Sequence, residues 1–538
     1  MGMIFTWCCL LIISIPKILI STMKAPMTVL QKNNFFLSAK HYQQFQTLIL
    51  NRTGMLFGLR RENALGRGVT GLALAATNGD VDRYFKRLEE SETDTPLWDD
   101  LIQEITIGET YFFRDKVQIN ALQQHILPQI ISNHQHDRRI RIWSAGCASG
   151  EEPYTLAMLL SELIVDPDQW NITILATDID KAVLEKARRA SYRDWSFRQT
   201  DEIYKSRYFR KQGETYQLVP WLQKRVQFFY LNLNDTVYPS LATNTNALDL
   251  ILCRNVAIYY SESVIRRVAE RFHRCLISGG WLMMGASETS IPVFHQYAAC
   301  NFSGATVFQK RTFPVSPTVR FDMNLMGAHG HREPIVPVLE TRIPIWEQDT
   351  VTDPFSEMEV AFDFKEPSPN DSSKKQDDVS PFAQGTQLLR EKRYEEAIAC
   401  FQSCVASTPG DGASLYQLAR IYANIGKMDA ARSACEQAIE INPLNQEAHY
   451  TLALIHQEAG DLASAVAQLK QALFIDNRFA LAHFSMALFC EQRGQREKAQ
   501  RHRQQAIRLA LQLDPDETLF GSEDLTARTL LTMMKTLS

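Results

Sequence analysis

At residues 141–153 the chain reads Arg-Ile-Trp-Ser-Ala-Gly-Cys-Ala-Ser-Gly-Glu-Glu-Pro. The apolar run before Gly146 predicts a buried strand, and the residues from Pro153 onward have helical spacing. Gly146 and Gly150 permit a tight turn and close approach of the backbone to a ligand. The stretch lacks both GxGxxG and the Lys-Ser/Thr pair of a phosphate loop, and Glu151 would repel a pyrophosphate. The turn therefore indicates an adenosine-type cofactor that carries hydroxyls and an amine, or a sulfonium cation.

Short apolar runs alternate with helical stretches on both sides of this turn. We expect strands at 140–143, 172–176, 226–230, 248–253 and 281–285, and helices between them at 153–163, 181–190 and 263–276. Such alternation predicts a parallel sheet with helices on both faces. The last two apolar runs, 280–285 and 305–310, have no clear helix between them. They are candidates for an antiparallel hairpin at the edge of the sheet.

Polar residues follow two of these strands. The second strand ends in Thr-Asp-Ile-Asp, residues 177–180, and an acidic residue there typically accepts hydrogen bonds from ribose hydroxyls. The alternative is that Asp180 only caps the next helix and Asp178 is a solvated neighbour. Arg254, Asn255 and Tyr259 follow the fourth strand, where the carboxyl ends of parallel strands line a ligand crevice. A surface turn with a buried tyrosine is the alternative there.

The composition indicates a multidomain protein of ordinary globular type. The 538 residues predict two or three domains, and 45% are hydrophobic and 22% charged. The net charge of −4 gives no basic excess, which argues against nucleic acid as a partner. The ten cysteines are mostly scattered, so we interpret them as reduced thiols of a cytoplasmic protein, without disulfides or a zinc site. We find no other metal-binding or Ser/His/Asp constellation.

The two ends and a central segment differ from the rest of the chain. Residues 1–27 are a doubtful extension, because the apolar run Ile4–Ile20 is interrupted by Pro16 and Lys17. It is short for a membrane span, and we favour an over-extended start over a signal peptide or anchor, with no stable membrane insertion. Residues 28–100 have helical spacing. Residues 312–380 are rich in proline and end in a polar run, which predicts a disordered linker.

Residues 381–515 repeat every 34 positions. The positions that match are Tyr416, Tyr450 and Phe484; Ala419, Ala453 and Ala487; Gly426, Gly460 and Gly494; and Ala438, Ala472 and Ala506. A helix–turn–helix period of this length and composition is identified as the tetratricopeptide repeat, or TPR. Such arrays present a concave groove, so we expect a protein partner there. Residues 516–538 are a tail.

Four motifs occur together and in order: residues 105–115, which read Ile-Thr-Ile-Gly-Glu-Thr-Tyr-Phe-Phe-Arg-Asp, residues 144–153, residues 176–180 and residues 253–259. In this combination the chain resembles the CheR family, the S-adenosylmethionine (SAM) dependent methyltransferases that esterify glutamates of chemotaxis receptors. The resemblance covers about residues 28–310. It implies an α/β fold, in which a helical domain (28–100) precedes a Rossmann-like class I methyltransferase domain (101–311). With its repeats the chain is similar to CheR–TPR fusions.

The resemblance also implies the site residues. The cofactor contacts would be Thr110, Arg114, Glu151 near the methionine part, Asp178 on the ribose, Asn232 and Leu233 beside the adenine, and Arg254 with Asn255. Arg114 and Tyr259 would be catalytic. The chain departs from the family at Gly108, where asparagine is expected, and its basic cluster of Arg60, Arg61 and Arg67 is weaker than expected.

The implied chemistry needs little beyond positioning. A glutamate carboxylate is ionised at pH 7, and the sulfonium activates the methyl group, so a strong general base is unnecessary. Arg114 would orient the substrate carboxylate and Tyr259 would donate a hydrogen bond. We expect methylation of glutamates on the cytoplasmic helices of methyl-accepting chemotaxis receptors. The alternatives are a SAM-binding scaffold that acts through its TPR groove without catalysis, and a methyltransferase for a small molecule or nucleic acid.

Overall fold

The computed structural model describes residues 37–57, 62–92, 95–106, 108–289, 293–311, 380–408, 410–522 and 524–535. The extension 1–27, the linker up to residue 379, and Arg60 and Arg61 lie outside the described residues. The chain divides into two compact units. The first contains residues up to Glu109 with the short segments Asp180–Ala182 and Tyr259–Ser261, and the second contains the rest. The sheet domain and the repeats therefore belong to one unit.

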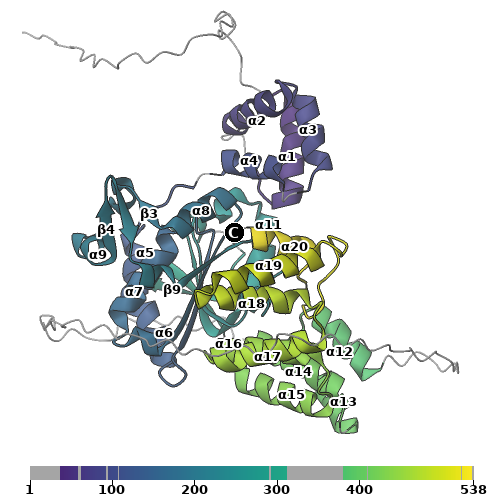
Figure 1. Ribbon diagram of the computed structural model, residues 1–538. Helices are drawn as coiled ribbons and strands as arrows, with labels where there is room; N and C mark the ends of the chain where they lie inside the picture. Colours follow the sequence, from purple (N-terminus) through teal and green to yellow (C-terminus); the bar gives the residue numbers. More distant parts are fainter. Residues whose placement is uncertain are drawn as a thin grey trace, which may run out of the picture. The chain divides into compact units, whose positions relative to one another are not determined.

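Among its described residues, the first unit contains a bundle of four helices, which Figure 1 shows. They are α1 (Ala39–Thr53), α2 (Glu62–Thr77), α3 (Val81–Glu90) and α4 (Pro96–Ile105). Their helical spacing buries Phe45, Tyr84 and Trp98 at 1% exposure or less. The side chain of Asp80 accepts a hydrogen bond from the backbone N–H of Arg83 (2.9 Å), which caps α3.

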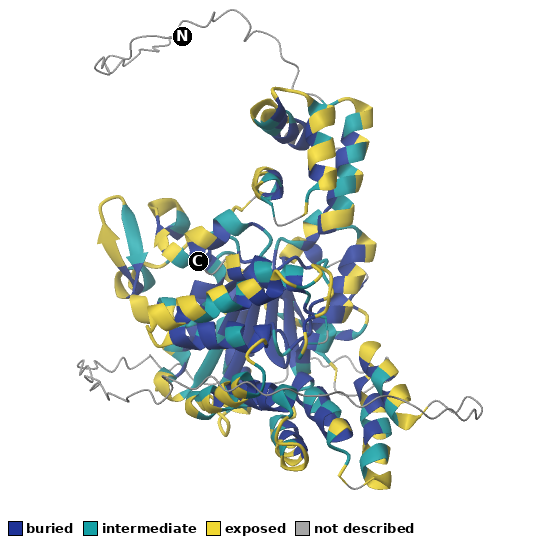
Figure 2. Ribbon diagram, turned by 45° about the vertical axis from the view of Figure 1, so that its right-hand side comes forward, coloured by how far each residue is buried: buried dark blue, intermediate teal, exposed yellow. Residues whose placement is uncertain are grey.

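The second unit is built on a seven-stranded sheet of order β6-β2-β1-β7-β8-β10-β9. Its strands are β1 (Arg139–Ala145), β2 (Asn171–Asp178), β6 (Val226–Tyr230), β7 (Leu248–Cys253), β8 (Leu276–Met284), β9 (Tyr297–Phe302) and β10 (Ala305–Lys310). Neighbours from β6 to β8 pair in parallel, with Ile142 opposite both Ile174 and Leu250. All six residues of β7 are buried, and Figure 2 shows the strands of the sheet in dark blue. Burial on both faces explains their continuous apolar sequence.

The helices of this sheet domain include the three predicted at 153–163, 181–190 and 263–276, and the others were not predicted. They are α5 (Lys116–Ala121), η2 (Leu122–Ile126), α6 (Leu127–Asn133), α7 (Glu151–Leu163), η3 (Pro167–Gln169), α8 (Lys181–Arg189), η5 (Ala257–Tyr259), α11 (Glu262–Cys275) and η6 (Ala286–Glu288). The predicted edge hairpin is partly wrong. β10 does pair antiparallel with β8, but β9 covers it on the other side and forms the edge. β9 was missed because only its first residue is buried and its sequence, Tyr-Ala-Ala-Cys-Asn-Phe, lacks the β-branched residues that mark a strand.

A second, three-stranded sheet lies in the segment between β2 and β6. It has the order β3-β5-β4, with β3 (Ser191–Tyr192), β4 (Phe209–Gln212) and β5 (Thr215–Leu218) all antiparallel. The short helices η4 (Asp194–Phe197), α9 (Glu202–Tyr208) and α10 (Pro220–Gln223) connect it. Phe112 packs its ring against those of Tyr192, Phe197 and Phe209, at centroid distances of 4.8–5.1 Å. This aromatic cluster anchors the segment around residue 112 to the small sheet.

The repeats form four helix pairs at the predicted spacing, and they stack as a green to yellow array in Figure 1. The pairs are α12 (Pro381–Arg390) with α13 (Tyr394–Ser407), α14 (Gly412–Asn424) with α15 (Met428–Ile441), α16 (Gln446–Glu458) with α17 (Leu462–Ile475), and α18 (Ala480–Gln492) with α19 (Arg496–Ala510). The repeated alanines are buried, which lets paired helices approach closely. A further helix, α20 (Ala527–Lys535), lies in the expected tail.

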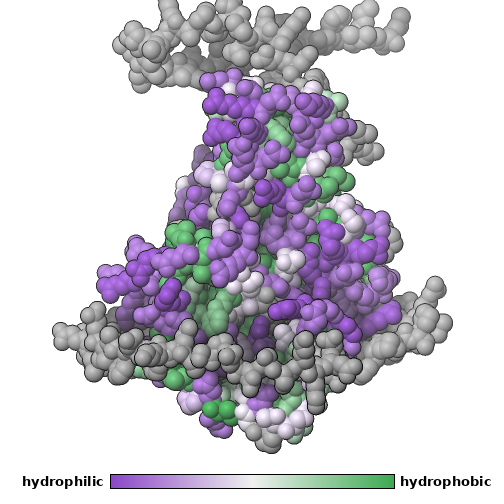
Figure 3. Space-filling model, turned by 90° about the vertical axis from the view of Figure 1, so that its right-hand side faces the viewer, coloured by the Kyte–Doolittle hydropathy of each residue, from purple (hydrophilic) through white to green (hydrophobic). Residues whose placement is uncertain are grey.

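The surface agrees with an ordinary polar exterior. The face drawn in Figure 3 is mainly hydrophilic, with limited and separate apolar patches. Within the described ranges, no helix combines the length and the apolar character that crossing a membrane requires.

Candidate functional site

The cofactor loop is held at the carboxyl end of the sheet by backbone hydrogen bonds. After β1, the N–H groups of Gly146 and Cys147 both donate to the carbonyl of Thr177, at 2.8 and 2.9 Å. Gly146 has a φ of +88°, and a Cβ there would overlap Cγ2 of Val256. The position therefore requires glycine both for its conformation and for space. This agrees with the tight turn that the sequence predicts.

Asp178 is joined to this loop. Its Oδ2 accepts the backbone N–H of Ala148 at 2.8 Å, and Ala148 itself has a φ of +47°. Asp180 caps its own helix, because its Oδ1 accepts the N–H of Ala182 at 2.8 Å. Asp180 thus plays the capping role of the alternative interpretation, but Asp178 is more than a solvated neighbour. Its carboxylate is oriented beside the loop between β1 and α7.

Glu151 begins α7 and is 2% exposed. The hydroxyl of Ser149 donates to its Oε2 at 2.7 Å, and that of Ser196 donates to its Oε1 at 3.0 Å. Burial raises the pKa of Glu151, and the two hydroxyls partly oppose that rise. A cationic group beside this carboxylate would favour its ionised form.

Arg254 connects three elements of the site. Its Nη1 donates to Oε2 of Glu152 at 3.1 Å, its Nε to Oε1 of Gln118 at 2.7 Å, and its Nη2 to the carbonyl of Arg114 at 2.6 Å. Glu152 also accepts the hydroxyl of Ser144 at 2.7 Å. Three of the five N–H groups of Arg254 are thereby used inside the protein. Its geometry is that of a residue that positions the site, in addition to any contact with a cofactor.

Glu152 was missed by sequence reasoning, which favoured its neighbour Glu151. The only indication in the sequence was that two acidic residues stand side by side at the start of a helix. Successive residues of a helix point in directions about 100° apart, so adjacent carboxylates reach different partners. Which of them meets an arginine depends on β7, about 100 residues later in the chain.

The motif around Thr110 and Arg114 is fastened by its phenylalanines. Phe112 and Phe113 are buried, and the N–H of Phe112 donates to the carbonyl of Ser196 at 2.9 Å. The N–H of Phe113 donates to the hydroxyl of Thr155 at 3.2 Å. Phe113 and Asp115 have φ values of +56° and +65°, a conformation that costs energy for residues other than glycine and is found mainly at functional sites. Arg114 lies between these two strained residues.

Asn232 follows the end of β6, which lies beside β2. The N–H of Leu231 donates to the carbonyl of Asp178 at 3.1 Å. Asn232 is 4% exposed, and its amide donates to Asp235 at 3.1 Å and accepts the N–H of Asn234 at 3.0 Å. Burial raises the pKa of Asp235 to about 7. Leu233 is also buried.

Asn255 has a φ of +61°, and its N–H donates to Oε2 of Glu288 at 2.9 Å. Glu288 is fully buried and also accepts the N–H groups of Gly285 (2.7 Å) and Ile258 (3.1 Å). Burial raises its pKa, and these backbone donors oppose the rise. Sequence reasoning missed Glu288 as well, because nothing near it in the sequence distinguishes it from a surface carboxylate.

Tyr259 falls in the other compact unit, where its carbonyl accepts the N–H of Leu56 at 2.7 Å. The remaining predicted residues belong to the second unit, and those from Glu151 onward follow the carboxyl ends of β1, β6 and β7 or, for Asp178, end β2. The full set is Thr110, Arg114, Glu151, Asp178, Asn232, Leu233, Arg254 and Asn255. This donor set fits an adenosine with a cationic end, since carboxylates suit ribose hydroxyls and a sulfonium, and no cradle for phosphates accompanies them.

Comparisons with known proteins find relatives for both the sheet domain and the repeats. Residues 108–303 match the family model described as CheR methyltransferase, SAM binding domain. Residues 388–455 and 426–487 match a tetratricopeptide repeat model. The chain is 30% identical to a chemotaxis protein methyltransferase of Listeria monocytogenes, over 46% of this chain and 90% of that protein. It is 37% identical to one of Borreliella burgdorferi, over 38% of this chain and 72% of that protein. Chemotaxis protein methyltransferase 1 of Pseudomonas aeruginosa is 35% identical, over 37% and 74%.

Proposed function

This chain belongs to the CheR family of SAM-dependent methyltransferases, and from this premise we propose that it methylates glutamates on the cytoplasmic helices of methyl-accepting chemotaxis receptors. One observation carries the proposal. Arg254 ties the carbonyl of Arg114 to Glu152 of the cofactor loop, so the residue expected to orient a substrate carboxylate is fastened to the cofactor site. Such a substrate places the enzyme in the cytoplasm.

In this proposal the loop residues hold SAM, whose sulfonium supplies an electrophilic methyl group. Asp178 accepts hydrogen bonds from the ribose hydroxyls, and Asn232 and Leu233 lie beside the adenine. Glu151 faces the cationic methionine end, where its buried carboxylate complements positive charge. Thr110 and Asn255 complete the contacts.

The chain itself has to position an acceptor that is already reactive. A glutamate side chain with a pKa of about 4.3 is ionised at pH 7 and needs no base. The guanidinium of Arg114 holds one carboxylate oxygen by a charge-assisted hydrogen bond, and the hydroxyl of Tyr259 donates a second. The strained backbone on both sides of Arg114 and the hydrogen bond from Arg254 limit its movement. Restricted movement favours in-line approach of carboxylate and methyl group.

The proposal is tested by incubating the protein with methyl-labelled SAM and membranes that contain its receptor, then measuring base-labile methyl esters. We expect Arg114→Ala to lower the rate about 100-fold, and Tyr259→Phe about 10-fold, because each loses one oriented hydrogen bond in the transition state. Arg266→Ala is the matched control, since Arg266 is 44% exposed and pairs with its helical neighbour Glu262 (2.9 Å) at the surface. Full activity of both site variants would overturn their assigned roles.

The same assay separates the alternatives. SAM binding without methyl esters on any receptor would favour a regulatory scaffold, for which the departure at Gly108 and the weaker basic cluster argue. Label that is stable to base and found in nucleic acid or a small molecule would indicate another methyltransferase class. The tetratricopeptide repeats support an interaction with protein.

A further inference from the structure

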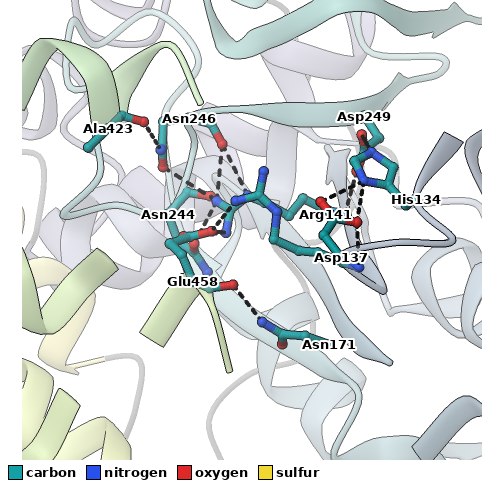
Figure 4. Close-up of polar contacts among 10 residues, drawn as sticks. His134, Asp137, Arg141, Asn171, Asn244, Asn246, Asp249, Ala423 and Glu458 are labelled. Atoms are coloured by element: carbon teal, nitrogen blue, oxygen red, sulfur yellow. Dashed lines mark hydrogen bonds and ion pairs between the residues drawn. The ribbon is translucent and has the colours of Figure 1, made fainter. Parts of the chain in front are cut away.

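The repeat array contacts its own catalytic domain at the amino end of the sheet. Arg141 of β1 is 2% exposed, and its Nη1 forms an ion pair with Glu458 at the end of α16 (Figure 4). The amide of Asn171 donates to the carbonyl of Glu458 at 2.7 Å, and the amide of Asn246 donates to the carbonyl of Ala423 at 3.1 Å. The carboxyl ends of α14 and α16 therefore face the catalytic domain rather than an open groove.

The turns inside the second and third repeats also lie against the catalytic domain, and the turn of the first repeat lacks the glycine that the others have. A Cβ on Gly426 would lie 3.1 Å from Cβ of Ala247, and one on Gly460 would lie 3.6 Å from Asn171. The equivalent position of the first repeat, 34 residues before Gly426, is Lys392, which keeps the left-handed conformation with a φ of +58°. This left-handed backbone conformation is strained for lysine but not for glycine, so a contact of the lysine side chain has to compensate for the strain.

Lys392 forms an ion pair with Asp524, which lies beyond the last repeat. The two charged atoms are 2.5 Å apart, and the side chains are 11% and 31% exposed. Asp524 belongs to a segment that we call the docking segment, residues 519–522 and 524–535. The ion pair joins the first repeat to a residue that follows the fourth, and so the docking segment spans the array.

The first part of the docking segment packs against aromatic side chains of the array. Gly521 has a φ of +83°, and a Cβ there would lie 2.6 Å from Cζ of Phe479 and 3.5 Å from Cδ1 of Tyr450. The ring of Phe520 is 5.4 Å from that of Phe479. Gly521 and Ser522 also line one small cavity, together with Arg420, Asn424, Thr451 and Leu454 of α14 and α16 and with residues 240–242 of the catalytic domain. α14 and α16 are the first helices of their pairs.

The second part, α20, bridges the array to the sheet. Leu530, Met533 and Met534 are at most 4% exposed. Met533 lines a cavity with Leu454 of α16 and Phe229 of β6. Because β6 leads to Asn232, the docking segment reaches the strand that ends at the proposed adenine site.

We propose that the groove of the repeat array is a peptide-binding site filled by the docking segment of this chain, and that an external protein binds by displacing it. The partner presents the same chemistry: an aromatic–glycine pair that packs on Phe479 and Tyr450, an acidic residue three positions after the glycine for Lys392, and an apolar residue after that. The interaction is independent of methyl transfer, so its test does not depend on the catalytic proposal.

The test uses the full chain and a labelled peptide of residues 514–535. Gly521→Val places side-chain atoms where Phe479 lies and should release the segment. We expect this variant to bind the peptide at least tenfold more tightly than the unchanged chain, whose groove is filled. Gly494→Val is the matched control, because Gly494 has a φ of +72° with no atom within 4 Å of its would-be Cβ. It should bind the peptide as weakly as the unchanged chain.

A charge exchange tests the same groove without altering the glycine. Lys392→Glu should speed hydrogen exchange at residues 519–526, and the double variant Lys392→Glu/Asp524→Lys should restore slow exchange. Equal peptide affinity in the unchanged chain and Gly521→Val, or hydrogen exchange unaffected by Lys392→Glu, would overturn the proposal and leave the segment a fixed structural strap. Restored protection together with tighter peptide binding would support it.

Discussion

The carboxyl end and the amino end of the seven-stranded sheet both bury charges, but they neutralise them differently. At the carboxyl end, Glu151 is bound by serine hydroxyls and Glu152 by Ser144 and Arg254. At the amino end, Arg141 is paired with Glu458, which lies 317 residues away in another domain. The first set is held by donors of the same domain, so we expect its local geometry to depend less on the repeats.

The carboxyl end is suited to binding a ligand, and the amino end is suited to holding the two domains together. A carboxylate held by hydroxyls and backbone N–H groups keeps its charge while remaining able to meet a cationic ligand. A buried guanidinium with one distant carboxylate makes the presence of the second domain a condition of stability. Strand β1 joins the two ends, since it begins at Arg139 beside Glu458 and leads into the cofactor loop.

The largest expected effect concerns the amino end. Glu458→Gln should lower the free energy of unfolding by about 3 to 5 kcal/mol, because the buried guanidinium of Arg141 loses its counter-charge. Burial already lowers the pKa of Arg141. Denaturant titration of the purified protein measures the change. The double variant Arg141→Met/Glu458→Leu should recover at least half of the loss, and Glu440→Gln on an exposed position should change nothing. A loss below about 1 kcal/mol in Glu458→Gln would remove the distinction between the two ends.

A smaller effect should depend on pH. His134 forms a hydrogen bond with Asp249 at 2.7 Å, which raises the pKa of His134 to about 9 against an ordinary value of 6.5. The stabilisation is therefore complete below about pH 6.5 and is lost as the pH rises through 9. We expect His134→Gln to cost roughly 2 kcal/mol at pH 6 and little at pH 10. Unfolding at both pH values checks this, with His136→Gln at an exposed position as control. A cost independent of pH would mean that packing, not charge, holds the pair.

A substitution at the carboxyl end should have the smallest effect on stability but should weaken SAM binding. Asp178→Asn keeps an acceptor for the N–H of Ala148 while removing the charge. We expect SAM affinity to fall about 10- to 30-fold, equivalent to about 1.4 to 2 kcal/mol, with unfolding unchanged within about 0.5 kcal/mol. Calorimetric titration and thermal unfolding give both numbers. Asp168→Asn, whose side chain is 97% exposed, is the control. Lost stability with intact affinity would reverse the roles of the two ends.

Local patterns predicted much of this molecule. The bounds of β6 and β7 agree with the mainly apolar runs at 226–230 and 248–253. All of β7 and most of β6 are buried, and buried strands need a largely apolar sequence. The small sheet of β3, β4 and β5 was not predicted. Its strands are two to four residues long, and seven of their ten side chains are partly or fully exposed, so they carry too short a pattern to recognise.

Long-range partners could not be predicted in the same way. Glu152, Glu288 and Glu458 appear in the sequence as ordinary acidic residues, and each acquires its role from a residue that folding brings to it. Their burial, rather than their identity, makes them important. A pattern with a period of two or 3.6 residues contains no information about such pairs.

The sequence by itself determined the strand–turn–helix at 141–153, the 34-residue repeats and the family motifs, because each depends on residues close together in the chain. Only the tertiary structure decided that Arg141 meets Glu458, and that Lys392 stands where the other repeats have glycine in order to meet Asp524. Those pairings arise when distant segments exclude water together, and an ion pair buried in that way depends on the whole fold.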